Sequence, residues 1–193
     1  MDARERDVDT EIRCLSVRLM CWRLKSQSMG CRGVLFAITQ KEAERLRAAR
    51  GNDTDVLSIV QDEIEEAWDE PHLCETDKAW DAMHRCLTNG KLSFDESDYP
   101  KNLCILGGEQ LHAGADYIVS LLTPEQVKEV AVALQPVKRD WFHDQYLKID
   151  REEYGFTFGE EDFEYTWDYF ERVREFYVRA ASENRWTIFT VDQ

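Results

Sequence analysis

The order of helix and strand signals along the chain is the feature that most constrains its fold. Gly33–Ile38 is a short, continuous apolar run, which is typical of a strand buried on both faces. Residues 186–191 are β-branched and aromatic and form a second clear strand signal. Residues 103–106 and 117–122 read as strands, and the remaining signals are helical without regular strand–helix alternation. This order predicts an α+β fold, with a small mixed β-sheet packed by several helices in a single domain.

Two helix starts have unusually complete signals. Thr39 is followed by Glu42 at the third helical position, which predicts a capping box. Thr123 is followed by Pro124 and Gln126, which adds a proline at the first helical position to the same pattern. Helices are expected over residues 40–49, 54–69, 77–87, 124–135, 139–147 and 160–183.

Length and hydropathy limit where the chain can act. With 193 residues, a chain can bury about 70% of its unfolded surface and needs neither disulfide nor metal to hold a core. No apolar run approaches the ~20 residues that span a bilayer, so no membrane role is expected. Arginines interrupt every hydrophobic stretch of residues 1–28, which argues against a secretory signal. We therefore expect a cytoplasmic protein whose six cysteines are mostly reduced.

Residues 1–28 are predicted to be an N-terminal extension. Their hydrophobic residues follow neither a helical nor a strand period, and Met29 shortly precedes the first convincing strand. A non-native start upstream of Met29 is the alternative interpretation. Residues 29–193 are therefore expected to form the domain, and they alone enter the functional argument.

The net charge of −15 restricts the class of partner. Nucleic acid is excluded as a ligand because neutralising phosphates requires clustered lysine and arginine. Residues 61–81 hold nine acids and one base, and residues 150–175 hold ten acids and three bases. Acidic surfaces of this kind serve solubility, or they attract a basic protein partner. Both interpretations remain open from the charge alone.

Four segments resemble the YfbM-like family of small bacterial proteins, which is classed as a domain of unknown function. The match begins with the strand and helix after Met29 and continues with D-K-x-W-x-x-L-H, which here spans residues 77–84 with Met83 in place of leucine. An L-G-G-E turn at residues 106–109 and a T-P-E helix start within residues 121–127 follow in the family's order. The resemblance implies an α+β fold over residues 29–193. It implies no activity, because the family has no established catalytic residues.

The predicted helix over residues 77–87 holds the first candidate site. Asp77, Trp80, Asp81 and His84 are three or four residues apart and share one helical face. A carboxylate near an imidazole is the arrangement a general base needs, while Trp80 would supply an apolar wall and Lys78 a cation. The structural alternative is that Asp77 caps the helix, Trp80 lies in the core and His84 bonds a carbonyl group.

The next candidate is the turn Gly107, Gly108 and Glu109. Paired glycines let a backbone approach a ligand closely, but no phosphate-binding motif surrounds them. The simpler interpretation is a tight turn with a residue at positive φ. Glu109 would be a partner for His84 if this turn folded over the helix.

The sequence has no residues at the spacing typical of a metal site or of a catalytic nucleophile. The H-x-C pairs at residues 72–74 and 84–86 supply zinc-type ligands, but no C-x₂₋₄-C or H-x₃₋₅-H pair accompanies them. No G-x-S-x-G nucleophile motif is present. We predict no metal and no cofactor.

Ten of the chain's 22 aromatic residues lie between residues 154 and 177, interleaved with acids. A helix buries one stripe, so Tyr165, Tyr169 and Phe176 are expected to stay partly exposed, with the two tyrosines near Glu160, Glu161 and Asp162. Exposed tyrosine next to carboxylate suits an arginine-rich protein surface. The alternative is that neighbouring elements cover both faces of this helix.

These observations predict a non-catalytic binding protein whose acidic surface takes a basic protein partner, with an inhibitor or immunity protein as one example. The alternative is an enzyme or small-ligand binder of unknown class, built around Asp77, Trp80, His84 and Glu109. The sequence leaves the partner, any substrate and the oligomeric state open.

Overall fold

The computed structural model describes residues 31–94 and 98–192. The expected extension over residues 1–28 therefore lies outside the described residues. The elements, in chain order, are β1 (Gly33–Ile38), α2 (Gln40–Ala49), α3 (Asp53–Ile59), a π-helix (Val60–Glu65), a 3₁₀ turn (Glu70–His72), β2 (Leu73–Asp77), α4 (Ala79–Leu87), a second 3₁₀ turn (Lys101–Cys104), β3 (Glu109–Gln110), β4 (Tyr117–Leu122), α5 (Pro124–Leu134), α6 (Arg139–Tyr146), α7 (Glu160–Ser182) and β5 (Trp186–Asp192).

The five strands form one sheet in the order β2-β1-β5-β4-β3, which confirms the α+β class. All four strand pairs are antiparallel, so the expectation of a mixed sheet is wrong. The long connection from β4 to β5 shows why. The chain leaves the end of β4 into α5 and returns along α7 to that same end, where Leu122 pairs with Thr187. A parallel pair would require a crossover to the opposite end of the sheet.

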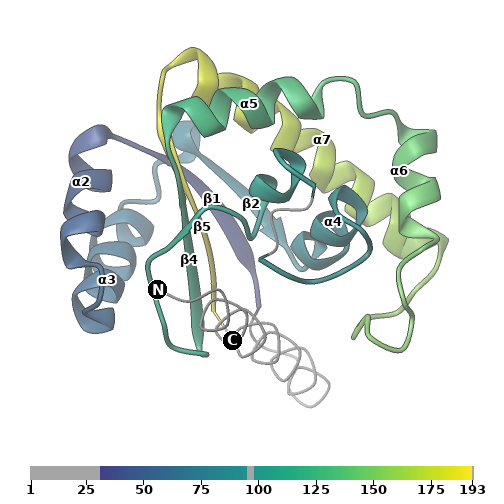
Figure 1. Ribbon diagram of the computed structural model, residues 1–193, viewed down its shortest axis with the longest axis horizontal. Coiled ribbons are helices and arrows are strands. Elements are labelled where there is room, and N and C mark those ends of the chain that lie inside the picture. Colours follow the sequence, from purple (N-terminus) through teal and green to yellow (C-terminus); the bar gives the residue numbers. More distant parts are fainter. Residues whose placement is uncertain (1–30, 95–97, 193) are drawn as a thin grey trace, which may run out of the picture.

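Helices cover both faces of the sheet (Figure 1). α2 and α3 lie on one face, and α4 to α7 form a larger layer on the other. β1 serves both layers because its side chains alternate: Phe36 and Ile38 join the core under α2 and α3, while Leu35 and Ala37 join the core under α4 and α7. Burial on both sides explains the continuous apolar run in this strand.

Local capping signals are confirmed. The side chain of Thr39 accepts a hydrogen bond from the backbone N–H of Glu42, and the Glu42 carboxylate accepts one from the Thr39 N–H. Thr123 and Gln126 repeat the arrangement at the start of α5. Each box satisfies backbone donors that the first helical turn leaves without partners.

Two predictions of secondary structure are wrong. Residues 103–106 are not a strand: the 3₁₀ turn Lys101–Cys104 includes the first two of them, and the buried Cys104 carbonyl accepts a hydrogen bond from Tyr177 Oη at 2.7 Å. A short apolar run fits a strand and a buried turn equally well. Conversely, Leu73–Asp77 forms the edge strand β2, although three of its five residues are polar. Its pairing with β1 is a long-range contact that local periodicity does not reveal.

Candidate functional site

The predicted active-site helix begins two residues later than expected. α4 starts at Ala79 with Lys78 at the N-cap position, and the Lys78 side chain makes no capping hydrogen bond. Asp77 is instead the last residue of β2, so the expectation that it caps the helix is wrong. Asp77 also has φ of +44°, a left-handed conformation uncommon for residues other than glycine. Asp77 therefore lies outside α4 and is not part of the helical face predicted for it.

Trp80 and His84 lie inside the core. The indole N–H of Trp80 donates to the Cys31 carbonyl at 3.0 Å, and the indole is 1% exposed. His84 has no exposed surface, and its Nε2–H donates to the Ser93 carbonyl at 2.8 Å. The pKa of His84 is lowered to about 4, chiefly by burial; the hydrogen bond to Ser93 opposes this shift, and the neighbouring Arg85 charge adds to it. A neutral, fully enclosed imidazole contacts no dissolved substrate, so this geometry matches the structural alternative for His84.

Asp81 is the partner of Arg85 and not of His84. The Arg85 Nε donates to Asp81 Oδ1 at 2.6 Å, and both side chains are buried. Arg85 also donates to the Gly90 carbonyl at 3.2 Å, which fixes the end of α4. This ion pair ties one turn of α4 together inside the core.

The Gly107-Gly108 turn has the conformation expected of a tight turn. Gly108 has φ of +100°, and a Cβ there would lie 2.5 Å from the Leu122 side chain and 2.6 Å from the Leu121 carbonyl oxygen. A Cβ on Gly107 would lie 2.8 Å from the Asn102 carbonyl oxygen. The glycines therefore let the turn pack against the protein's own backbone.

Glu109 lies away from His84. Its carboxylate accepts hydrogen bonds from Arg47 Nε at 2.8 Å and Arg50 Nη1 at 3.1 Å, both on the α2 side of the sheet. The hypothesis that Glu109 partners His84 is wrong, because β3 directs this carboxylate to the opposite layer from α4. The four residues proposed for an enzymatic site therefore do not converge.

The structure does bring together members of two separate candidate sets. The backbone N–H of Lys78 donates to Tyr165 Oη at 3.2 Å, and the Tyr165 hydroxyl is also hydrogen-bonded to Asp77. The rings of Tyr165 and Tyr169 meet edge to face with centroids 4.9 Å apart. Burial, followed by the hydrogen bond to Asp77, raises the pKa of Tyr165, so its hydroxyl stays protonated. All four residues are half-buried, so the cluster reaches the surface.

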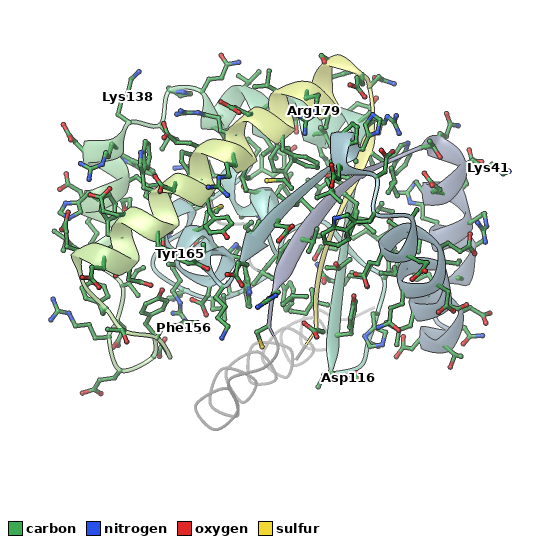
Figure 2. All side chains as sticks on the ribbon, turned by 180° about the vertical axis from the view of Figure 1, so that it is seen from behind. Lys41, Asp116, Lys138, Phe156, Tyr165 and Arg179 are labelled. Atoms are coloured by element: carbon green, nitrogen blue, oxygen red, sulfur yellow. The ribbon has the colours of Figure 1, made fainter. Side chains whose placement is uncertain are left out.

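Two arginines complete this surface. Arg172 lies over the Tyr169 ring at 5.0 Å from its centroid, and Arg32 Nε lies 3.5 Å from Asp77 Oδ1. We call Arg32, Asp77, Lys78, Tyr165, Tyr169 and Arg172 the tyrosine patch; Figure 2 labels Tyr165, on α7. Sequence reasoning missed both arginines. Arg172 lies three residues after Tyr169 on α7, a spacing that could have revealed it, whereas Arg32 lies beside Asp77 because β1 pairs with β2. The patch thus pairs aromatic faces and a carboxylate with guanidinium groups.

The predicted acidic residues of α7 divide into two kinds. Glu160 and Glu161 are exposed in the first helical turn. Asp162 is half-buried, and its Oδ2 accepts hydrogen bonds from Tyr146 Oη at 2.7 Å and Tyr154 Oη at 2.8 Å. Burial raises the pKa of Asp162 despite these two donors. Asp162 therefore links the start of α7 to α6 and to the preceding loop by hydrogen bonds, whereas Glu160 and Glu161 face solvent.

Metal-ligating side chains do not gather in the part of the chain that the structure covers. Among residues 31–94 and 98–192, no group of three or more histidine, cysteine or acidic residues is arranged to hold a metal ion. Cys31, Cys74, Cys86 and Cys104 are buried free thiols. None of the described helices combines the length and apolar character needed to cross a membrane.

Comparison with known proteins places the chain in a family. YfbM from Escherichia coli, a protein of unknown function, has a similar structure with a TM-score of 0.62 and 20% sequence identity. The match covers 83% of this chain and 99% of YfbM, and at this identity it shows the fold alone. Comparison with curated proteins gives no match. The family model described as "Domain of unknown function (DUF1877)" matches residues 29–190. The α+β fold of this chain is similar to that of YfbM, and the chain belongs to this family.

Proposed function

We propose that this protein is a non-catalytic, cytoplasmic binding protein that takes an arginine-rich, basic protein partner on the tyrosine patch. The observation that carries the proposal is that the patch already holds guanidinium groups of its own chain. Arg172 stacks on Tyr169, and the 78% exposed Arg32 side chain lies beside Asp77. An arginine from a partner would meet the same aromatic face and carboxylate.

Charge around the patch supports the same class of partner. Glu160, Glu161 and Asp168 are exposed on α7, next to or within two turns of Tyr165. The chain as a whole carries a net charge of −15. The electrostatic attraction from this negative charge raises the association rate of a basic protein, and the attraction weakens as ionic strength rises. Tyrosine is also enriched among the residues that dominate binding energy in protein interfaces.

The geometry supports the alternative, an enzyme built on Asp77, Trp80, His84 and Glu109, less well. His84 and Trp80 are enclosed, and Glu109 pairs with arginines on the other layer. Within the binding proposal, an inhibitor or immunity protein that neutralises a basic toxic protein matches the small size and acidity of the chain.

The test is a capture experiment from lysate with mass spectrometry. The full chain carrying Tyr169→Ala and Asp168→Asn is compared with the wild type at low and high salt. Removing an aromatic hot spot costs about 2 kcal/mol or more, so we expect capture of a basic protein to fall at least ~10-fold. The same partner should also leave the wild type as salt is raised.

The matched control neutralises two acids on the opposite layer, Asp62→Asn with Glu66→Gln. Both residues are exposed, on or next to the π-helix that follows α3. Retention of the partner by this control and its loss from the α7 variant would support the patch. Equal capture by both variants and the wild type, or capture that high salt leaves unchanged, would contradict the proposal.

A further inference from the structure

A second cluster of ionisable side chains, separate from the tyrosine patch, surrounds His72. This residue ends the 3₁₀ turn directly before β2. Its Nδ1 lies 2.7 Å from Asp69 Oδ2, within the same turn. Its Nε2 lies 3.0 Å from Glu183 Oε2 and 2.9 Å from Arg185 Nη2, both in the turn between α7 and β5. The imidazole therefore connects the start of β2 to a turn 111 residues later in the chain.

The two contacts of His72 Nε2 require different protonation states of the ring. A carboxylate accepts hydrogen bonds, whereas a guanidinium only donates them. With a proton, Nε2 can donate to Glu183 but cannot accept from Arg185. Without a proton, Nε2 can accept from Arg185 but cannot donate to Glu183. The Nδ1–H donates to Asp69 in both cases, so the two arrangements of the ring differ only at Nε2.

Arg185 is held beside the ring by two other contacts. Its Nε lies 3.4 Å from Glu183 Oε2, and its Nη1 donates to the Ala37 carbonyl at the end of β1 at 3.4 Å. It therefore stays close to His72 whether or not Nε2 accepts its hydrogen bond. Three more charged side chains lie on the adjoining elements: Glu70 in the 3₁₀ turn, Arg179 on α7, and Lys128 on α5, which bonds Asn184 at 2.5 Å.

We infer that His72 is a pH-sensitive latch between the start of β2 and the α7–β5 turn. In the neutral form, Nε2 accepts from Arg185, which directly precedes β5. In the protonated form, Nε2–H donates to Glu183, the C-cap residue of α7. Histidine suits this role because its charge changes between pH 5 and 8, and the His72 side chain is 23% exposed, so water reaches it.

The latch lies at the opposite end of β2 from the tyrosine patch, because β2 begins directly after His72 and ends at Asp77. Protonation thus changes which neighbouring segment holds this edge strand at its first residue. The inference does not depend on the basic partner proposed for the patch.

The test is NMR of the full chain labelled with ¹⁵N, which shows which ring nitrogen carries a proton. His72→Gln identifies the signals of this ring. At pH 8 the neutral ring should carry its proton on Nδ1, with Nε2 accepting from Arg185. As the pH falls, Nε2 should gain a proton, and the Arg185 guanidinium signals should shift over the same pH range because their acceptor is lost.

Two substitutions should change proton binding at Nε2 in opposite directions. Arg185→Met removes the cation and leaves the ring between two carboxylates, so the second proton should bind at least ~5-fold more tightly. Glu183→Gln removes the negative charge that the protonated form faces, so this proton should bind at least ~5-fold more weakly.

The matched control makes the same two substitutions in another arginine–carboxylate pair, as Arg139→Met and Glu164→Gln. Glu164 lies near the start of α7 and Glu183 at its C-cap, roughly 28 Å apart along the helix. Salt screens charges over this distance, so both controls should leave proton binding at His72 within about twofold of wild type. Backbone NMR spectra check that every variant is folded.

Three results would overturn the inference. The first is a neutral ring with its proton on Nε2, and the second is a ring that already carries both protons at pH 8. The third is a change in proton binding that is the same in Glu183→Gln and in its control, Glu164→Gln. The wild-type spectrum and Glu183→Gln decide the matter even if Arg185→Met does not fold. None of these measurements uses a binding partner, so failure of the capture experiment leaves them unchanged.

Discussion

Acidification should destabilise this protein through His84. The ring is fully buried and neutral in the folded state, and burial lowers its pKa from 6.5 to about 4. In the unfolded chain the same imidazole binds a proton near its ordinary pKa. Between these two values the unfolded state therefore holds more protons than the folded state. By linkage, the free energy of unfolding falls as pH drops through this window and levels off below it.

The size of the effect follows from the difference in pKa. A shift from 6.5 to about 4 lowers the free energy of unfolding by about 3 kcal/mol once the pH lies below both pKa values. At pH 5 the unfolded imidazole is mostly charged while the folded one is mostly neutral, so about 2 kcal/mol of this is already lost relative to pH 7. Such a loss is a large share of the stability of a domain of ordinary size.

The assay is urea unfolding of the wild type and His84→Gln at several pH values between 5 and 8. Glutamine can still donate to the Ser93 carbonyl but does not titrate. Subtracting the two curves removes the groups that both proteins share and should leave the slope of His84 alone. Met83→Leu, a buried change on the same helix, should keep the wild-type slope. Parallel curves for the wild type and His84→Gln would refute the reasoning.

Three further predictions concern stability measured by chemical denaturation. Gly108→Ala should lower the free energy of unfolding by about 2 kcal/mol or more, because its φ of +100° and contacts of 2.5–2.6 Å leave no room for a Cβ. Gly51→Ala, at φ of +92° with no neighbour within 4 Å, should lower it by about 1 kcal/mol. Equal losses in the two variants would mean that the turn at Gly108 relaxes freely. Arg85→Met should lower the free energy of unfolding by about 3–5 kcal/mol because it removes the buried ion pair with Asp81, and adding Asp81→Leu should restore much of this loss. Additive effects in the double variant would contradict a coupled pair. Trp80→Phe should cost about 1–3 kcal/mol through a buried carbonyl left without its donor, and an unchanged midpoint would argue against this bond.

Elements defined by neighbouring residues could be read from the sequence. The capping boxes at Thr39 and Thr123 depend on atoms within three residues, and both form as predicted. The strand over Tyr117–Leu122 and the long helix α7 agree with their apolar periods. β2 was missed because Glu75, Thr76 and Asp77 give it a polar sequence, and only its pairing with β1 makes it a strand.

Site residues were harder to predict, because their chemistry depends on what packs around them. A helical period places His84 and Asp81 on one face, but it carries no information on the loop that covers His84 or on Arg85 as the stronger partner of Asp81. Helical spacing also suggested Tyr165 and Tyr169 as surface residues, and the structure leaves both half-buried at the surface. Phe176, expected to be partly exposed with them, is 1% exposed and belongs to the core.

The sequence by itself determined the capped helix starts at Thr39 and Thr123, the strands over Gly33–Ile38 and Tyr117–Leu122 and the family resemblance from residue 29 onward, because caps, periods and motifs are local properties of the chain. Tertiary structure alone decided that every strand pair is antiparallel, that His84 is enclosed and that Glu109 faces α2. It also placed Asp77 beside Tyr165. These features come from contacts between segments far apart in the chain, whose free energy no local pattern encodes.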